Sequence, residues 1–299
     1  MFRTITVGLD GSPESVAAAD WAALEAERRE VPLRLLHVRP GESSAEIPHV
    51  DPEIRRHWAE QIPREASERL ARRHPGLSVG YEQQVGVAPV VLARAVGEGG
   101  LLVLGSRGLG TVAGFLSGSV AQAVAAHAPF PVVLVRPDAD ESTGGAGAGP
   151  APGAPEAADV VVGLDGGEPS EALLEFAFDA AASRGVPLRV VSAWELPPLY
   201  GPNPAGVVDP GLLTAYTQEH AAKLTDALRP WRGRYPDVVV REASVLGRPA
   251  RELTLASLRA SLVIVGRRTR RSRVGAQLGR VAHALIHHSP APVAIVPHA

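Results

Sequence analysis

The sequence predicts two tandem α/β domains, each built on a doubly wound, five-stranded parallel sheet. Three observations lead to this prediction: the length of 299 residues, an internal repeat, and apolar runs of strand length that alternate with helical patterns. Two domains of about 140 residues each account for the length, which exceeds what one ordinary α/β core needs. The runs LLVLG and PVVLV are apolar without alternation, as is typical of parallel strands covered on both faces.

The internal repeat covers most of the chain, and its segments keep the same order in both halves. VGLDGSPES at residues 7–15 recurs as VGLDGGEPS at residues 162–170. The closing segments also match, because GSVAQAVAAHAPFPVVLV from Gly118 corresponds to GRVAHALIHHSPAPVAIV from Gly279. Two equivalent folding units are therefore expected.

A segment rich in Gly, Ala and Pro separates the two copies at residues 138–158. It offers neither a hydrophobic face nor helical continuity, which is typical of a flexible linker. The first domain is therefore expected at residues 1–137 and the second at residues 159–299.

Strands of the first copy are expected where short apolar runs occur. These runs lie near residues 3–9, 33–39, 77–83, 100–104 and 131–135. Helices are expected where a cap or turn residue precedes a residue suited to the first helical turn, proline above all. Such starts occur at Ser12-Pro13, Asp51-Pro52, Ala88-Pro89 and Gly118-Ser119.

The composition excludes several classes of protein. The 30 basic and 32 acidic residues nearly balance, so a general attraction to nucleic acid or to a membrane surface is not expected. The chain has no cysteine, which excludes disulfides, thiolate metal sites and a cysteine nucleophile. No apolar run approaches the ~20 residues that span a bilayer, and the first apolar run stops at Asp10, too early for a signal peptide. A folded cytoplasmic protein is expected.

The segment after the fourth expected strand carries the chemistry, because ligands bind beyond the carboxyl ends of parallel strands at the switch point. There Gly105, Gly108, Gly110 and Gly114 lead to Gly118 at a helix start. Glycines let backbone amides approach an anion closely, and a helix N-terminus adds unpaired N–H donors and a positive dipole end. A single glycine pair would indicate only a tight turn, but the full run favours phosphate binding.

At these residues the sequence resembles the universal stress protein family. The nucleotide-binding members of that family carry Gly, two residues, Gly, nine residues, Gly, then Ser or Thr, and Gly105, Gly108, Gly118 and Ser119 fit that spacing. The opening VGLDGS and the closing PFPVVLV resemble the family too, and the likeness extends over both copies but not the linker. It implies a tandem member with a Rossmann-like sheet of the adenine nucleotide alpha hydrolase-like type. It further implies ATP as the ligand, with Mg²⁺ as its accompanying ion.

The resemblance implies a nucleotide site across the ends of strands one, two and four. Its residues would be Leu9, Asp10, Val38, Leu104, Gly105, Arg107, Gly108, Gly118, Ser119 and Val120. Asp10 would lie near the ribose or base, Val38 would contact adenine through its backbone, and Arg107 would pair with phosphate. Two alternatives stay open, because Asp10 also suits a turn ahead of Ser12-Pro13 and Val38 also suits a core position. No catalytic residue and no metal ligand are assigned.

The second copy departs from this pattern. Gly266 and Gly279 remain, but Thr269 and Arg280 replace the second glycine and the serine. A β-branched Thr resists positive φ, and Arg fills the space of a small hydroxyl, so we expect this copy to bind ATP weakly or not at all. Five arginines between Arg267 and Arg273 suit a nucleotide phosphate, a phosphorylated partner or RNA, and a solvated basic loop is the alternative. RNA is disfavoured because no aromatic cluster accompanies the arginines and the overall charge is near zero.

Histidines give a second set of candidates. His283 and His287 lie four apart on an expected helix, a spacing that suits two ligands of one metal, but a helix C-terminus by itself favours histidine. We expect the second explanation, and a structural role for His37 at the end of the second strand. The sequence lacks the P-loop motif and the acidic cluster of a receiver domain.

Three functions compete at this stage. The first is a regulatory stress-response protein that is not an enzyme, and whose ATP occupancy selects an unknown protein partner. The second is a slow ATPase or phosphotransfer enzyme with Ser117 or Ser119 as acceptor, for which the sequence offers no arranged general base. The third is a scaffold without nucleotide. Duplicated family members resemble dimers made within one chain, here through Val132–Val135 and Val293–Val296, and pairs of chains can then form a homodimer.

Overall fold

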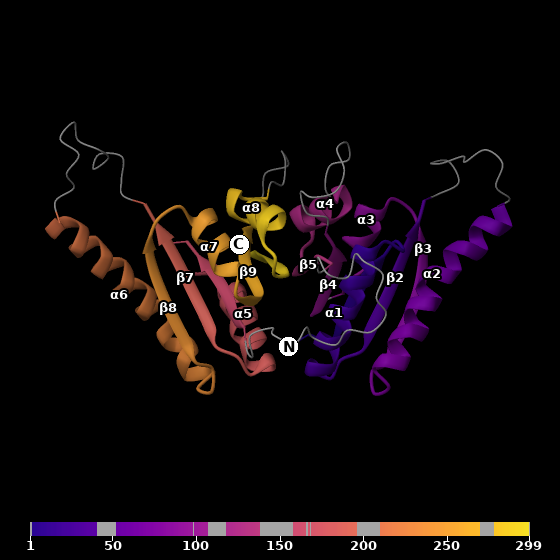
Figure 1. Ribbon diagram of the computed structural model, residues 1–299, viewed down its shortest axis with the longest axis horizontal. Helices are drawn as coiled ribbons and strands as arrows, with labels where there is room; N and C mark the ends of the chain where they lie inside the picture. The colour runs from indigo at the N-terminus through magenta and orange to yellow at the C-terminus, as the bar shows by residue number, and fades with distance from the viewer. Residues whose placement is uncertain are drawn as a thin grey trace. The chain divides into compact units, whose positions relative to one another are not determined.

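The computed structural model describes residues 2–40, 52–97, 99–106, 118–137, 158–165, 167, 169–195, 210–269 and 278–298. The chain divides into two compact units, one built mainly from the first copy of the repeat and one mainly from the second (Figure 1). All of the expected linker except Ala158 lies outside the described residues.

The first unit contains five parallel strands in the order β3-β2-β1-β4-β5, which confirms the doubly wound sheet. Its elements are β1 (Thr4–Leu9), α1 (Pro13–Arg29), β2 (Leu33–Arg39), α2 (Pro52–Arg73), β3 (Val79–Val85), α3 (Ala88–Leu92), β4 (Gly100–Gly105), α4 (Ser119–His127) and β5 (Val132–Val135). The third strand begins two residues later than expected, because the Leu77 N–H donates to the His74 carbonyl (3.0 Å) and closes a turn there.

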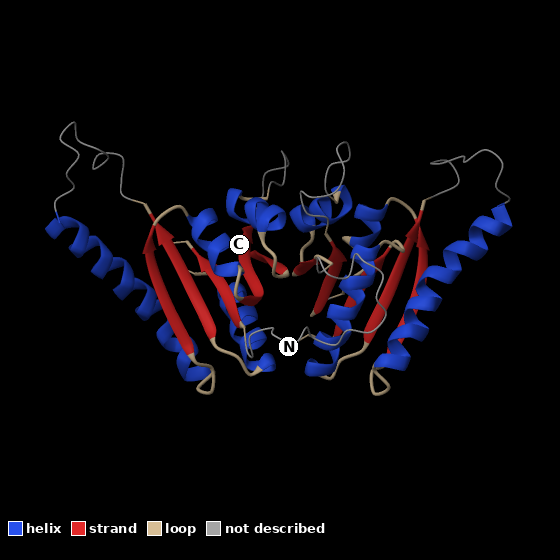
Figure 2. Cartoon of the chain, viewed as in Figure 1, coloured by secondary structure: helices blue, strands red, loops and turns tan. Residues whose placement is uncertain are grey.

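Strand β1 lies at the centre of this sheet, between β2 and β4. Leu9 at its end is in register with His37 of β2, and Val7 is in register with Val103 of β4. The chain order reverses at β1, so the carboxyl ends of β1 and β4 form the switch point where such folds bind ligands. Within this unit strands and helices alternate along the chain, from β1 to β5 (Figure 2).

Helix α1 follows β1 directly and begins as expected. Ser12 is its N-cap, and the Ser12 hydroxyl accepts a hydrogen bond from the Ser15 N–H (3.2 Å). The buried face of the helix is rich in alanine, with Ala18, Ala22 and Ala26 fully buried. Small side chains let α1 pack closely on β1 and β4, and this packing positions the start of α1 beside the end of β4.

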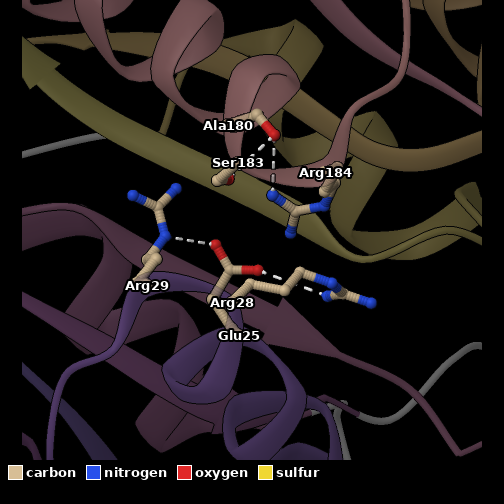
Figure 3. Close-up of polar contacts among 6 residues, drawn as sticks. All are labelled: Glu25, Arg28, Arg29, Ala180, Ser183 and Arg184. Atoms are coloured by element: carbon tan, nitrogen blue, oxygen red, sulfur yellow. Dashed lines mark hydrogen bonds and ion pairs between the residues drawn. The ribbon is translucent and has the colours of Figure 1, made fainter.

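A buried carboxylate lies in the last turns of α1. Glu25 is 1% exposed, and the Arg29 Nε atom lies 2.6 Å from one of its oxygens. Arg28 approaches the other oxygen at 3.6 Å, as Figure 3 shows. Arg29 is itself 6% exposed, and its guanidinium lies 4.9 Å from the centre of the Phe2 ring. Two cations therefore compensate the buried charge of Glu25.

The second unit repeats the same architecture, with strands in the order β8-β7-β6-β9-β10, all parallel. Its elements are β6 (Asp159–Leu164), α5 (Glu171–Arg184), β7 (Leu188–Trp194), α6 (Pro210–Arg234), β8 (Val240–Leu246), α7 (Pro249–Ser257), β9 (Ala260–Arg268), α8 (Arg280–His288) and β10 (Val293–His298). Among the described residues of the whole chain, no helix is long and apolar enough to cross a membrane.

Candidate functional site

A cavity of about 350 Å³ opens at the carboxyl ends of β1, β2 and β4 in the first unit. This volume is within the range of small-molecule sites. The lining comes from strand ends, from the β1–α1 turn, from α3 and from the first turn of α4. The lining residues are Gly8, Leu9, Asp10, Ser12, Glu14, Ser15, Leu36, Val38, Ala88, Leu92, Leu104, Gly105, Gly118, Ser119, Val120 and Ala121.

Gly105, the last residue of β4, brings the strand against the backbone of α1. A Cβ atom on Gly105 would lie 2.5 Å from the carbonyl carbon of Glu14 and 2.6 Å from its oxygen. No side chain fits at that separation, and backbone cannot move aside as a flexible side chain can. Glycine at this place is therefore required by the close approach of β4 to α1, whatever the cavity binds.

The turn between β1 and α1 is closed by Asp10. The Asp10 Oδ1 atom accepts hydrogen bonds from the Ser12 N–H (3.0 Å) and from the Ser12 hydroxyl (2.5 Å). This is an Asx turn, and it holds Ser12 where it caps α1. The turn role considered for Asp10 is thus confirmed, and the exposed side chain also lines the cavity.

Gly118 is the N-cap of α4 and has φ +44° and ψ 52°, in the left-handed region that favours glycine. The first helical bond of α4 runs from the Gln122 N–H to the Gly118 carbonyl (3.0 Å). The amides of Ser119, Val120 and Ala121 come before this bond, and the first amides of a helix have no acceptor within it. Together with the positive end of the helix dipole, they suit an anion.

The other wall of the cavity is apolar. It contains Leu36 and Val38 from β2, Leu92 from α3 and Leu104 from β4. Val38 is half-buried and lines the cavity, so it is not a closed core position. His37, between the two β2 residues, is 8% exposed and its Nδ1 atom lies 2.8 Å from the Leu9 carbonyl oxygen, which confirms the structural role expected for it.

The structure brings together eight of the ten residues that the sequence assigned to the site. These are Leu9, Asp10, Val38, Leu104, Gly105, Gly118, Ser119 and Val120. Arg107 and Gly108 lie outside the described residues. Sequence reasoning missed Glu14 and Ser15, although the predicted helix start at Ser12-Pro13 places the first turn of α1 beside the same strand ends.

The second unit differs at the equivalent strand end. β4 ends at Gly105, whereas β9 continues past the equivalent Gly266 to Arg268, which is in register with His298 of β10. The Thr269 N–H and hydroxyl both donate to the His298 carbonyl, at 2.6 and 2.8 Å. Thr269, which stands where the first copy has the second glycine of its motif, is therefore hydrogen-bonded to β10.

Side-chain contacts near the strand ends of the second copy also differ from those of the first. Arg268 donates a 2.6 Å hydrogen bond to Asp165, which is equivalent to Asp10. Trp194 follows Ala193, the equivalent of Val38, and its ring stacks on His220 of α6 with 4.5 Å between ring centres. Arg267 is buried, and this burial lowers the pKa of its guanidinium.

A separate cavity of about 30 Å³ lies against α6 and is lined by Asp165, Ser192 and His220, among other residues. It is not the counterpart of the cavity in the first unit, whose lining includes residues of α3 and α4.

Comparisons with known proteins agree with the repeat and with the fold. The universal stress protein family matches residues 1–136 and 158–297. Universal stress protein Rv2005c of Mycobacterium tuberculosis is 35% identical over 300 residues, which cover 97% of this chain and 96% of the relative. Universal stress protein Rv1996 of the same organism is 35% identical over 321 residues, with 97% and 94% covered.

Solved structures show the same fold. The crystal structure of a universal stress protein from Archaeoglobus fulgidus superposes with a TM-score of 0.69 at 18% identity, and the match covers 99% of both chains. A universal stress protein structure from Pseudomonas aeruginosa gives a TM-score of 0.57 at 17% identity, over 99% of this chain and 93% of that one. The chain belongs to the universal stress protein family, as a tandem member with one family domain in each half.

Proposed function

We propose that the first copy binds ATP and that the chain is a cytoplasmic regulatory protein whose nucleotide occupancy selects its protein partner. Membership in the universal stress protein family supports a role in stress response. The observation that carries the proposal is the gathering of eight expected site residues around one cavity of about 350 Å³.

The two walls of the cavity match the two ends of a nucleotide. Leu36, Val38 and Leu92 offer apolar surface for a base, and sites of this kind combine such surface with a few convergent polar groups. Gly118 and the first amides of α4 offer donors and a favourable dipole for phosphate oxygens. The Ser119 hydroxyl, which also lines the cavity, adds a further donor.

Mg²⁺ would accompany the phosphates, and the residues present fit it. The ion prefers oxygen ligands and usually binds through one or two carboxylates together with substrate phosphates. Two acidic residues, Asp10 and Glu14, and two serines, Ser12 and Ser15, are among the residues that line the same cavity. We therefore expect ATP to bind more tightly with Mg²⁺ than without it.

The test is an equilibrium titration of MgATP into the full chain, with two matched substitutions. Gly118→Val places a β-branched side chain at φ +44°, whereas Gly279→Val acts at φ −59° and ψ 158°, which any residue adopts. We expect one nucleotide per chain, roughly tenfold or greater weakening by Gly118→Val, which is about 1.4 kcal/mol or more, and no change with Gly279→Val.

Circular dichroism of both variants would establish that they remain folded. Native mass spectrometry of the wild-type chain gives the stoichiometry independently of the titration. Absence of saturable binding, or a Gly118→Val variant that binds as tightly as the wild type, would refute the proposal.

A further inference from the structure

Helix α8 carries two histidines that the nucleotide proposal does not use. His283 and His287 lie four residues apart, so they share one face of the helix, and their ring centres are 4.5 Å apart with 52° between the ring planes. We propose that this pair chelates a divalent transition metal ion of the copper or nickel type. This site is independent of nucleotide binding, because it lies in the copy that lacks the intact glycine spacing.

The distance between the two rings is compatible with one kind of coordination geometry in particular. An imidazole nitrogen binds a metal at about 2.0–2.1 Å, which puts each ring centre about 3.2 Å from the ion. Two rings at a right angle around the ion then have centres about 4.5 Å apart, whereas a tetrahedral angle separates them by about 5.2 Å. The observed 4.5 Å between ring centres is compatible with a right angle at an ion bound by one nitrogen of each ring, which is the geometry of square-planar and tetragonal Cu²⁺ and Ni²⁺.

The pair can bind an ion without disturbing the core. The buried residues of α8 are Ala282, Leu285 and Ile286, which lie on a different side of the helix from the two histidines. His283 is exposed and His287 is half-buried. His287 lies in the last turn of α8, where the dipole favours a cation. His283 lies earlier, since its N–H donates to the Gly279 carbonyl (2.9 Å) at the start of the helix, so the helix C-terminus expected from the sequence does not explain His283. Two imidazoles leave further coordination positions for water or for an outside ligand.

The first copy shows that the repeat does not require these histidines. Gln122 and Ala126 of α4 occupy the positions that match His283 and His287, whereas His127 matches His288. Helices α4 and α8 therefore both carry a histidine at the position of His127 and His288. The chelating pair belongs to the second copy alone.

The experiment titrates Ni²⁺ and Cu²⁺ into the full chain without a histidine tag. The chain has ten histidines, so binding must be assigned by substitution. His283→Gln and His287→Gln each leave one imidazole, and His288→Gln is the matched control on the same helix. We expect one micromolar site, weakened roughly tenfold or more by either of the first two changes and unaffected by the third, because a chelate becomes a single ligand.

Electron paramagnetic resonance of the Cu²⁺ complex gives a second readout, since hyperfine splitting from two imidazole nitrogens should become splitting from one in the His283→Gln chain. Thermal unfolding without metal checks that the variants fold, and His283→Gln decides the outcome if His287→Gln does not fold. The proposal fails if Ni²⁺ and Cu²⁺ do not bind, or if they bind equally well to the wild-type and His283→Gln chains.

Discussion

Arg268 donates a 2.6 Å hydrogen bond to the carboxylate of Asp165, the residue of the second copy that is equivalent to Asp10 of the first. In the first copy the Asp10 carboxylate instead accepts from Ser12 and lines a cavity. The two copies therefore use the same acid differently. In the second copy the acid lies beside the extended end of β9, and we expect this arrangement to oppose nucleotide binding there.

Replacing Arg268 by Ala tests whether this ion pair alone closes the second site. The Arg268 and Asp165 side chains are 65% and 63% exposed, and exposed pairs contribute only about 0–1 kcal/mol. We expect the free energy of unfolding in urea to change by no more than about that amount. We also expect the nucleotide stoichiometry to stay at one per chain, because Thr269 and Arg280 still replace the second glycine and the serine of the motif. A second bound nucleotide would contradict this account.

Gly105→Ala tests the close approach of β4 to α1. The added Cβ would lie 2.5 Å from the carbonyl carbon of Glu14, and we expect a loss of about 1–3 kcal/mol of unfolding free energy together with weaker ATP binding. The matched control is Gly266→Ala, whose nearest neighbour would be the His298 side chain at 2.7 Å. A flexible side chain can move, so the control should cost less. Equal losses in chemical denaturation would argue against the close-approach explanation.

Arg29→Ala and Arg28→Ala compare two cations beside one carboxylate. Removing Arg29 leaves Glu25 buried without its 2.6 Å partner, and breaking a buried pair costs about 3–5 kcal/mol. Arg28 is 40% exposed and 3.6 Å away, so its removal should cost about 0–1 kcal/mol. Urea unfolding of both variants measures the difference. Equal losses of unfolding free energy in the two variants would contradict the explanation that burial makes the Arg29–Glu25 pair important.

Asp10→Asn and Asp10→Ala separate the turn role of Asp10 from its role towards a ligand. Asn keeps an oxygen acceptor for the Ser12 N–H, so we expect its stability to match the wild type, while Ala should lose about 1 kcal/mol. Both variants should bind ATP several-fold more weakly, because hydrogen bonds to a charged acceptor are the stronger ones. Calorimetric titration measures this, and wild-type affinity in Asp10→Asn would restrict Asp10 to the turn.

Local patterns were sufficient to predict most of the fold. Apolar runs located the strands, and Ser12-Pro13 located the start of α1, since caps and proline act within a few residues. The third strand was displaced by two residues because the turn at His74 depends on a backbone hydrogen bond that composition does not indicate. Glu14 was missed as a cavity residue because its approach to Gly105 comes from packing between distant segments.

The sequence by itself determined the two copies, the parallel α/β architecture and the place of the glycines, because a repeat, strand periodicity and spacing are all local properties of the chain. Tertiary structure alone decided that Gly105 meets the backbone of Glu14 and that Arg268 meets Asp165, 103 residues away in the chain. It also decided that β9 continues past Gly266. Contacts of this kind depend on which strand ends and side chains the folded sheet brings together, and no local pattern encodes that geometry.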